Sequence, residues 1–337
     1  MLFCSLRQIL STDRYSLLRK KGAKKRTTGI YDRLIVINDN LDIFTLPDIL
    51  EIISLTWNIY GVSVLFGFQH KDKTVLKLYA KCLREEVAAN LPQENVTYNA
   101  KISVVHNFLM SDSMCSPALK VDVYAKKVDQ EDSIEKSIYR GILFSWNTNS
   151  NLNASNSVKL PLLLCRGTNS CMKVIHSTLS RMFDCLIVKL PLEDEDLMWL
   201  LPILIIPITE DERPSESEQV RLEYIVPGLP ITDTITITLY SLDLVKILNV
   251  IIKNPRNEIT SAINLTIEHV KKFHECLRAH ILKVAGLQLG LCTLNRINVR
   301  TGALMNNKMK ISDPRTIKRV LLYIMEKASE MFHTVLF

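Results

Sequence analysis

The chain has 337 residues, of which 47% are hydrophobic and 23% charged, as expected of a globular protein with one large core or two smaller ones. It holds only ten glycines and no glycine-rich phosphate loop, which argues against a nucleotide-binding enzyme. The eight cysteines form no CxxC pair, and the longest apolar run, 197–208, contains two prolines and is too short to cross a bilayer. We therefore predict neither a disulfide framework nor a membrane association.

The net charge of +7 is unevenly distributed along the chain. Residues 1–33 carry a net charge of +7 and residues 271–327 carry +9, whereas residues 34–270 carry −8. Cationic ends around an acidic middle are typical of a protein that touches a polyanion with its ends and other proteins with its body. The alternative is a solvated surface with no anionic partner.

Residues 1–33 are predicted to form a basic, largely disordered tail, because they are charged and lack a sustained apolar period. Six of the eight residues from Arg19 to Arg26 are cationic, a density typical of a nuclear-import signal. The residues that we assign to import are Lys20, Lys21, Lys24, Lys25 and Arg26. A mitochondrial transit peptide is the rival interpretation, since the segment also bears serine and is poor in acids.

The rest of the chain, 34–337, is predicted to form one α+β domain, with a possible subdivision at the acidic loop 209–219. Up to this loop, apolar periodicity and turn residues predict helices over 45–60, 72–90, 170–183 and 194–205. The same patterns predict strands over 62–68, 97–109, 119–128, 137–146, 160–165 and 186–190.

Beyond the acidic loop, the patterns predict helices over 242–253, 266–285 and 314–333 and strands over 219–226, 232–240, 287–299 and 304–311. Strand meanders mixed with helices indicate a mainly antiparallel, curved sheet with packed helices. The chain is expected to end in a strand–strand–helix unit, and we place the partner- and DNA-facing part of the protein in residues 266–337.

Several stretches of the sequence, taken in order, resemble the centromere protein L family. They are Trp57-Asn58-Ile59-Tyr60, Leu65-Phe66-Gly67-Phe68, Gly141-Ile142-Leu143-Phe144, Leu160-Pro161-Leu162-Leu163-Leu164 with Gly167, Phe183-Asp184-Cys185, Leu197-Met198-Trp199 and Asn307-Lys308-Met309-Lys310-Ile311. The resemblance covers roughly residues 46–330. It implies a non-catalytic inner-kinetochore scaffold, in the nucleus at the centromere, that pairs with centromere protein N and other subunits of the constitutive centromere-associated network and acts in chromosome segregation.

The last two predicted strands contain the clearest candidate site. Odd positions such as Ile297, Met305 and Met309 are apolar and even positions are polar, so one face should be packed and the other open. If the strands pair around Thr301-Gly302, four cations share the open face: Arg296, Arg300, Lys308 and Lys310. A solvated sheet face is the plain interpretation, but the resemblance favours weak contact with the phosphates of centromeric DNA or a nucleosome.

The final predicted helix is apolar on most of its sides and needs cover on more than one of them. We assign a partner interface to one side: Ile317, Val320, Leu321, Ile324 and Met325. A strand edge in the neighbouring hairpin could also extend its sheet into another chain. In the alternative, the helix is sandwiched within its own domain.

Other clusters do not predict catalysis, a cofactor or a metal. His269, Cys276 and His280 share one face of a predicted helix, but only Cys276 and His280 are close enough for one ion, and zinc sites in proteins use three or four ligands. Cys185 and His176 lie on opposite sides of a predicted helix end, so a core cysteine is the simpler interpretation. Beside the scaffold we keep two alternatives: an enzyme that processes nucleic acid on the basic C-terminal sheet, and a mitochondrial protein.

Overall fold

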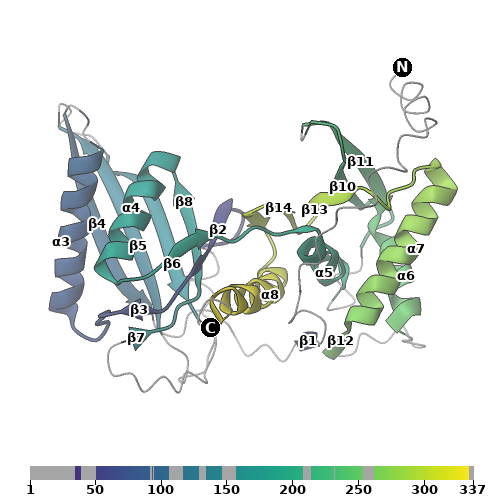
Figure 1. Ribbon diagram of the computed structural model, residues 1–337, viewed down its shortest axis with the longest axis horizontal. Helices are drawn as coiled ribbons and strands as arrows, with labels where there is room; N and C mark the ends of the chain where they lie inside the picture. Colours follow the sequence, from purple (N-terminus) through teal and green to yellow (C-terminus); the bar gives the residue numbers. More distant parts are fainter. Residues whose placement is uncertain are drawn as a thin grey trace.

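One large antiparallel sheet runs through the molecule and carries helices on both of its faces (Figure 1). The computed structural model describes residues 35–38, 51–91, 93, 95–105, 117–128, 134–145, 157–207, 214–230, 232–252 and 262–333. Within these ranges the sheet has eleven strands and includes strands from both sides of the 209–219 loop. The α+β class and the antiparallel sheet are as predicted.

The strands are not in chain order across the sheet, because the last strands pair with the first. From one edge to the other the order is β11 (Thr234–Tyr240), β10 (Gln219–Ile225), β13 (Thr293–Val299), β14 (Gly302–Met305), β15 (Lys308–Ile311), β2 (Trp57–Val62), β8 (Leu162–Gly167), β6 (Lys136–Phe144), β5 (Ala118–Lys127) and β4 (Val96–Val105). β9 (Ile187–Lys189) also pairs with β2. Two small sheets join β1 (Ile35–Asn38) to β12 (Ala262–Leu265), and β3 (Leu65–Phe66) to β7 (Ser157–Val158).

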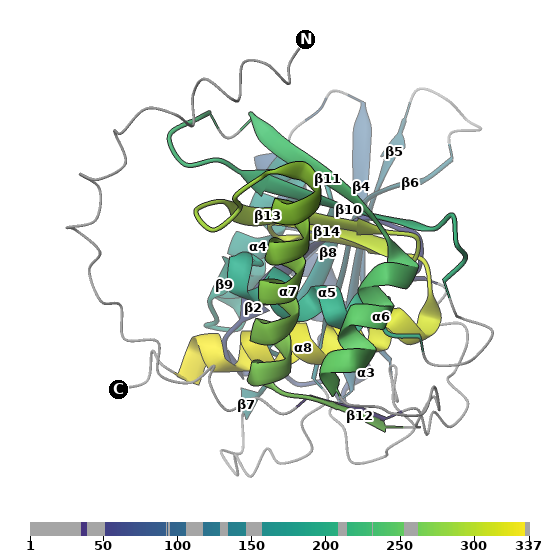
Figure 2. The same cartoon turned by 90° about the vertical axis from the view of Figure 1, so that its right-hand side faces the viewer.

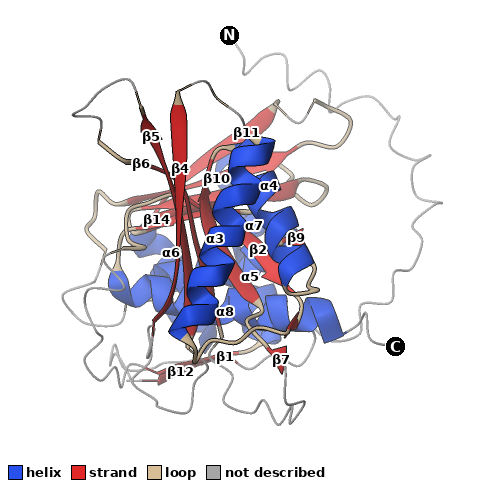
Figure 3. Cartoon of the chain, turned by 90° about the vertical axis from the view of Figure 1, so that its left-hand side faces the viewer, coloured by secondary structure: helices blue, strands red, loops and turns tan. Residues whose placement is uncertain are grey.

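Side-chain alternation along β2 separates two hydrophobic cores. Trp57 and Ile59 lie in a core shared with α5 (Asp194–Ile205), α6 (Ser241–Ile252), α7 (Ile267–Ala285) and α8 (Pro314–His333). Tyr60 and Val62 lie in the other core, shared with α3 (Lys73–Asn90) and α4 (Asn169–Met182). Figure 3 shows α3 and α4 side by side over the strands, and Figure 2 shows α6 and α7 in front of α5 at the opposite end.

Helix α5 forms the centre of the larger core. Its start is set by a reciprocal capping box between Glu193 and Asp196, and three acids in its first turn suit the positive end of the helix dipole. Nine of its twelve residues are buried, because β13, α6, α7 and α8 surround it. A helix that is apolar all round is stable only when it is covered all round. None of the helices in the described ranges is long and apolar enough to span a membrane.

Most of the predicted elements are confirmed, and helices 194–205 and 314–333 have the predicted bounds. The helix predicted over 45–60 is wrong throughout its described part, because residues 51–54 form turns and Trp57–Tyr60 form strand β2, while 45–50 lie outside the described residues. This strand is buried on both faces, so its apolar residues do not alternate with polar ones and the strand signal is lost. The strand predicted over 304–311 is divided by a turn at Asn306, whose φ of 50° asparagine tolerates better than most residues.

Candidate functional site

Three of the four predicted cations of the C-terminal strands lie on the open face of β13, β14 and β15. Across these strands Arg296 is opposite Met305, Met305 is opposite Lys308, and Ala303 is opposite Lys310. Directly paired residues share one face of a sheet, so Arg296, Lys308 and Lys310 lie together. The other face buries Ile297, Leu304 and Met309 in the larger core. The predicted grouping of these three cations therefore holds.

The structure corrects two details of this face. The hairpin turn lies where it was expected, but Arg300 stands in the turn beyond the end of β13 rather than on a strand. Met305 was expected on the packed face with Met309, yet it lies on the open face because the turn at Asn306 and Asn307 reverses the chain. A single period of two cannot be carried through a turn.

Two of the four cations are engaged by acids from a distant segment. Arg296 forms an ion pair with Glu223 of β10 at 3.3 Å, and the exposed Arg300 forms one with Glu218 at 2.9 Å. The Glu218 carboxylate also accepts a hydrogen bond from Ser241 Oγ at 3.2 Å. Lys308 and Lys310 are exposed and have no acidic partner among the described residues. The positive charge that this face offers to a ligand is therefore concentrated in the two lysines.

A second basic site lies at the end of the other half of the sheet. There the start of α4 and the ends of β2, β4, β5, β6 and β8 enclose a groove of about 1030 Å³. Five cationic side chains line it: Lys126, Lys127, Lys136, Arg140 and Arg166. No aspartate or glutamate is among the described lining residues. Arg140 is held by the buried Asp122 at 2.7 Å, whereas Lys126, Lys136 and Arg166 have no ion pair in the described ranges.

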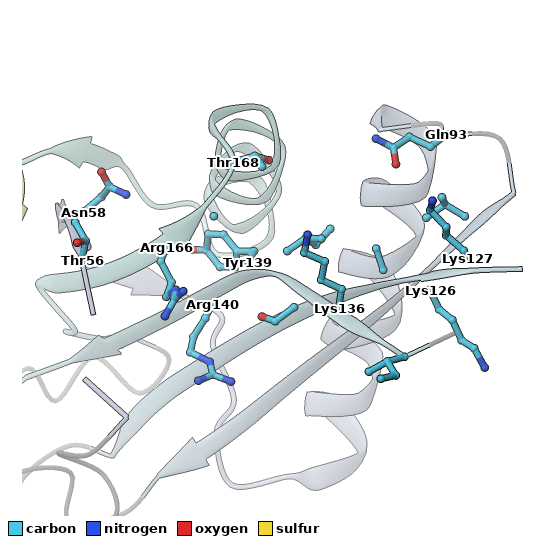
Figure 4. Close-up of a pocket in the computed structure, with 16 residues that line it drawn as sticks. Thr56, Asn58, Gln93, Lys126, Lys127, Lys136, Tyr139, Arg140, Arg166 and Thr168 are labelled. Carbon is cyan, nitrogen blue, oxygen red and sulfur yellow. The ribbon is translucent and has the colours of Figure 1, made fainter. Parts of the chain in front are cut away.

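The cations approach this groove from both faces of the sheet. Figure 4 shows Arg140 and Arg166 extending from the strands away from Thr168 at the start of α4, whereas Lys136 extends to the same side as Thr168. The β6–β8 register agrees with this view. Arg140 is opposite Arg166, so both lie on one face of the sheet, and Tyr139 is opposite Gly167 on the other face. The Thr168 side chain caps α4, and the first turn of α4 has no acid to offset the helix dipole. The arrangement suits an anionic ligand.

Sequence reasoning missed this groove because its residues come from five strands in the region with a net charge of −8. The one local signal was the pair Lys126-Lys127 at the end of a predicted strand. The groove adjoins the first surface: Asn58 lines it and is opposite Lys308 in the β2–β15 pairing. The two basic sites therefore lie on one continuous stretch of sheet.

The five residues assigned to a partner interface on α8 are buried within the chain itself. Ile317, Val320, Leu321, Ile324 and Met325 have at most 6% of their surface exposed, because α8 lies between α5 and strands β2, β8 and β15. The helix is thus sandwiched in its own domain, which is the alternative given with that assignment. The strand edge expected in the hairpin is also occupied, since β13 pairs with β10 and β15 pairs with β2. Among the described strands, the continuous order instead ends at β11 and β4.

The histidines and cysteines considered for metal binding and catalysis lie in surroundings that are typical of residues with a structural role. His269 takes part in the capping box of α7, with its Nδ1 3.4 Å from the Thr266 nitrogen. The described residues contain no group of three or more His, Cys, Asp or Glu placed to hold a metal ion. Burial lowers the pKa of His176 to about 4 and raises the pKa of Cys185 to about 11, the reverse of what a base and a thiolate nucleophile require.

The import residues Lys20, Lys21, Lys24, Lys25 and Arg26 lie outside the described residues.

Comparison with protein-family profiles matches residues 51–329 to the family described as centromere protein L. No curated protein sequence matches the chain. The family match includes strands from both halves of the sheet, from β2 to β15 along the chain, and ends within α8.

Proposed function

The chain belongs to the centromere protein L family, and we propose on that basis that it is a non-catalytic scaffold subunit of the inner kinetochore. The family assignment gives the chain a role at the centromere. We propose further that it resides in the nucleus, pairs with centromere protein N, and joins other subunits of the centromere-associated network on centromeric chromatin for chromosome segregation. The observation that supports the proposal is a match over 51–329 that includes both cores and both basic sites.

Imaging a fluorescently tagged copy through mitosis tests the scaffold proposal. Paired foci at the centromeres are expected. A diffuse signal, or one confined to mitochondria, would contradict it.

In the same experiment, neutralising Lys20, Lys21, Lys24, Lys25 and Arg26 tests the proposed import signal: the folded variant should stay outside the nucleus when centromere protein N is depleted. Entry of that variant under the same conditions would overturn the import assignment.

The edge of β11, which pairs with no other strand in the described part of the chain, supports pairing with another chain. Its seven residues contain no charge and no proline, and half-buried Ile235, Ile237 and Leu239 alternate with exposed Thr236 and Thr238. Natural edge strands are usually blunted by charges or prolines, because open backbone groups pair readily with another strand. We therefore place the contact with centromere protein N at this edge, by strand addition.

Lysines on the edge strand test this placement. Thr236→Lys with Thr238→Lys puts charges on β11 and should weaken pairing with centromere protein N by more than about tenfold, since charged edge strands resist pairing. Thr97→Lys on β4 is the matched control, because Thr97 is an exposed threonine on the opposite edge strand of the same sheet. Copurification or analytical ultracentrifugation would measure the pairing. Equal effects of the β11 and β4 changes would remove the contact from β11.

The open face of β13–β15 supports weak contact with DNA phosphates. Charge reversal at Lys308 and Lys310 should weaken binding to every duplex sequence and flatten its salt dependence by about one unit of log–log slope for each phosphate that is no longer neutralised. The same reversal at Arg296 and Arg300 should have less effect, because Glu223 and Glu218 already engage these arginines. Fluorescence anisotropy across a salt series measures both. An unchanged slope for the lysine variant would move the DNA contact elsewhere.

A further inference from the structure

The basic groove at the ends of β2, β4, β5, β6 and β8 is a binding site that the proposed DNA contact does not use. We propose that it binds an extended acidic segment of a partner protein, one that carries apolar side chains between its carboxylates. The proposal goes beyond the scaffold role, because it assigns a ligand class to a second surface. It rests on the shape of the groove, the mixed chemistry of its lining and the distribution of its charges.

The shape of the groove suits a single chain better than a duplex. A volume of about 1030 Å³ is at the upper end of the range of sites that enclose small ligands. A duplex is wider than its own major groove, which already spans about 12 Å, so double-stranded DNA is too thick to enter a space of about 1030 Å³. Duplex DNA would therefore lie across the outside of the rim. An extended peptide is a few ångströms thick and could lie within the groove, along the strand ends.

The lining combines cations with apolar side chains. Val96, Ile138 and the exposed Ile134 line the groove together with the five cations. A phosphodiester backbone offers them only its sugar carbons and no aliphatic side chain. A peptide that alternates carboxylates with aliphatic residues can satisfy both kinds of neighbour, since successive side chains of an extended strand point in opposite directions. The strand bulge between Val123 and Tyr124 lies at this end of the sheet, where Ile138 interrupts the β5–β6 register.

The charges of the groove are available to a ligand. Lys126, Lys136 and Arg166 are exposed and carry no ion pair in the described ranges, in contrast to the arginines of the C-terminal face. The uncompensated N-terminus of α4 adds positive potential beside Thr168. Four acids lie in the sequence between β5 and β6. Asp129, Glu131 and Asp132 lie outside the described residues, and the exposed Glu135 accepts a hydrogen bond from Asn99 Nδ2 at 3.1 Å. The test therefore includes a background in which all four are amides, so that their carboxylates cannot compete with a ligand.

The probe is a fluorescent peptide of about ten residues, about 35 Å long when extended, in which glutamate and leucine alternate. We expect saturable binding to the full chain, and no binding of the same peptide with glutamine in place of glutamate. The groove variant Lys126→Glu, Lys136→Glu, Arg166→Glu should lose at least about tenfold in affinity, because it reverses three charges at the site. The matched control Lys73→Glu, Lys77→Glu, Lys272→Glu reverses three exposed cations outside the groove and should bind as well as the unchanged chain.

A second titration with duplex DNA separates this site from the proposed DNA contact. The groove variant should keep its DNA affinity within about twofold, and Lys308→Glu with Lys310→Glu should keep its peptide affinity while losing DNA binding. The peptide site is overturned if no peptide binds in either background, or if the groove variant loses DNA affinity and not peptide affinity. Failure of the lysine variant to affect DNA would contradict the DNA contact alone. Circular dichroism confirms that each variant is folded.

Discussion

The two halves of the sheet use their positive charges differently. The C-terminal half is basic by sequence, yet many of its cations act within the fold: Arg296 and Arg300 pair with glutamates, Lys327 pairs with Asp196, and the buried Arg319 donates to the Ile206 carbonyl at 3.1 Å. The N-terminal half lies in the region with a net charge of −8, yet it presents five cations around one groove. Regional net charge therefore does not indicate where a protein offers charge to a ligand, because pairing across the sheet decides which cations remain available.

The largest expected effect of a substitution at neutral pH is a loss of stability when a structural cation of the C-terminal half is removed. The buried Asp196 accepts hydrogen bonds from Tyr323 Oη at 3.0 Å, from the Glu193 nitrogen at 2.7 Å and from Lys327 Nζ. Lys327→Met should lower the free energy of unfolding by about 3 kcal/mol, because it leaves a buried carboxylate without its cation. Lys136→Met in the groove should change it by less than about 0.5 kcal/mol.

Urea denaturation measures both changes. The double variant Asp196→Asn, Lys327→Met should recover part of the loss, since neither charge then remains buried. If the Lys327 and Lys136 variants unfold at the same urea concentration, the proposed division between structural and available cations is wrong.

Among the residues that the structure describes, each half contains one buried histidine, and both should make the protein less stable in acid. Burial lowers the pKa of His176 and of His274 to about 4, and neutral His274 donates Nε2–H to the Met198 carbonyl at 2.8 Å. In the unfolded chain both titrate near their ordinary value of about 6.5, so the unfolded state binds more protons between about pH 6.5 and pH 4. The contribution of each neutral histidine to the free energy of unfolding is complete above this window. About 3 kcal/mol per histidine is lost as pH falls through the window.

Stability measured from pH 8 to pH 4 tests the two sites separately. His176→Gln should remove the pH dependence that arises in the α3–α4 core, and His274→Gln that of the α5–α8 core. Each substitution should reduce the slope of the free energy of unfolding against pH below pH 6.5. Because the two side chains lie in separate cores, the reductions should be additive. A slope that neither substitution changes would assign the acid sensitivity to other groups.

The smallest expected effect is a gain of DNA binding when the paired arginines are released. Glu218→Gln with Glu223→Gln removes the partners of Arg300 and Arg296. Affinity for duplex DNA should rise severalfold, and the salt dependence should steepen by up to about one unit for each arginine that reaches a phosphate. Stability should fall by less than about 1 kcal/mol per pair, as is usual for partly exposed ion pairs.

The control for this gain is Glu216→Gln, an exposed acid in the same loop with no ion pair in the described ranges. It removes one negative charge, half of what the double change removes, without freeing an arginine. If it gives half or more of the gain in DNA affinity that the double change gives, the gain reflects net charge alone and the pairing has no special role.

Local patterns in the sequence were sufficient for most of the helices and for the type of sheet. Helix α5 begins at an acidic capping box and α8 at a proline, and both signals act within one turn of the chain. Alternation likewise assigned Arg296, Lys308 and Lys310 to one open face, because the period of two is a local property of a strand. The family resemblance was also readable from short ordered stretches and is confirmed by the match over 51–329.

Only the tertiary structure decided which of these charges are available and which apolar faces are covered. Glu223 is 73 positions from Arg296, and the groove assembles residues from strands that are scattered between 56 and 168. Helix α8 could not be assigned to the core or to a partner from its own pattern, since the same apolar stripe fits either surface. Strand order, register and cover are set by contacts between distant segments, and these contacts leave no signal within a local window of sequence.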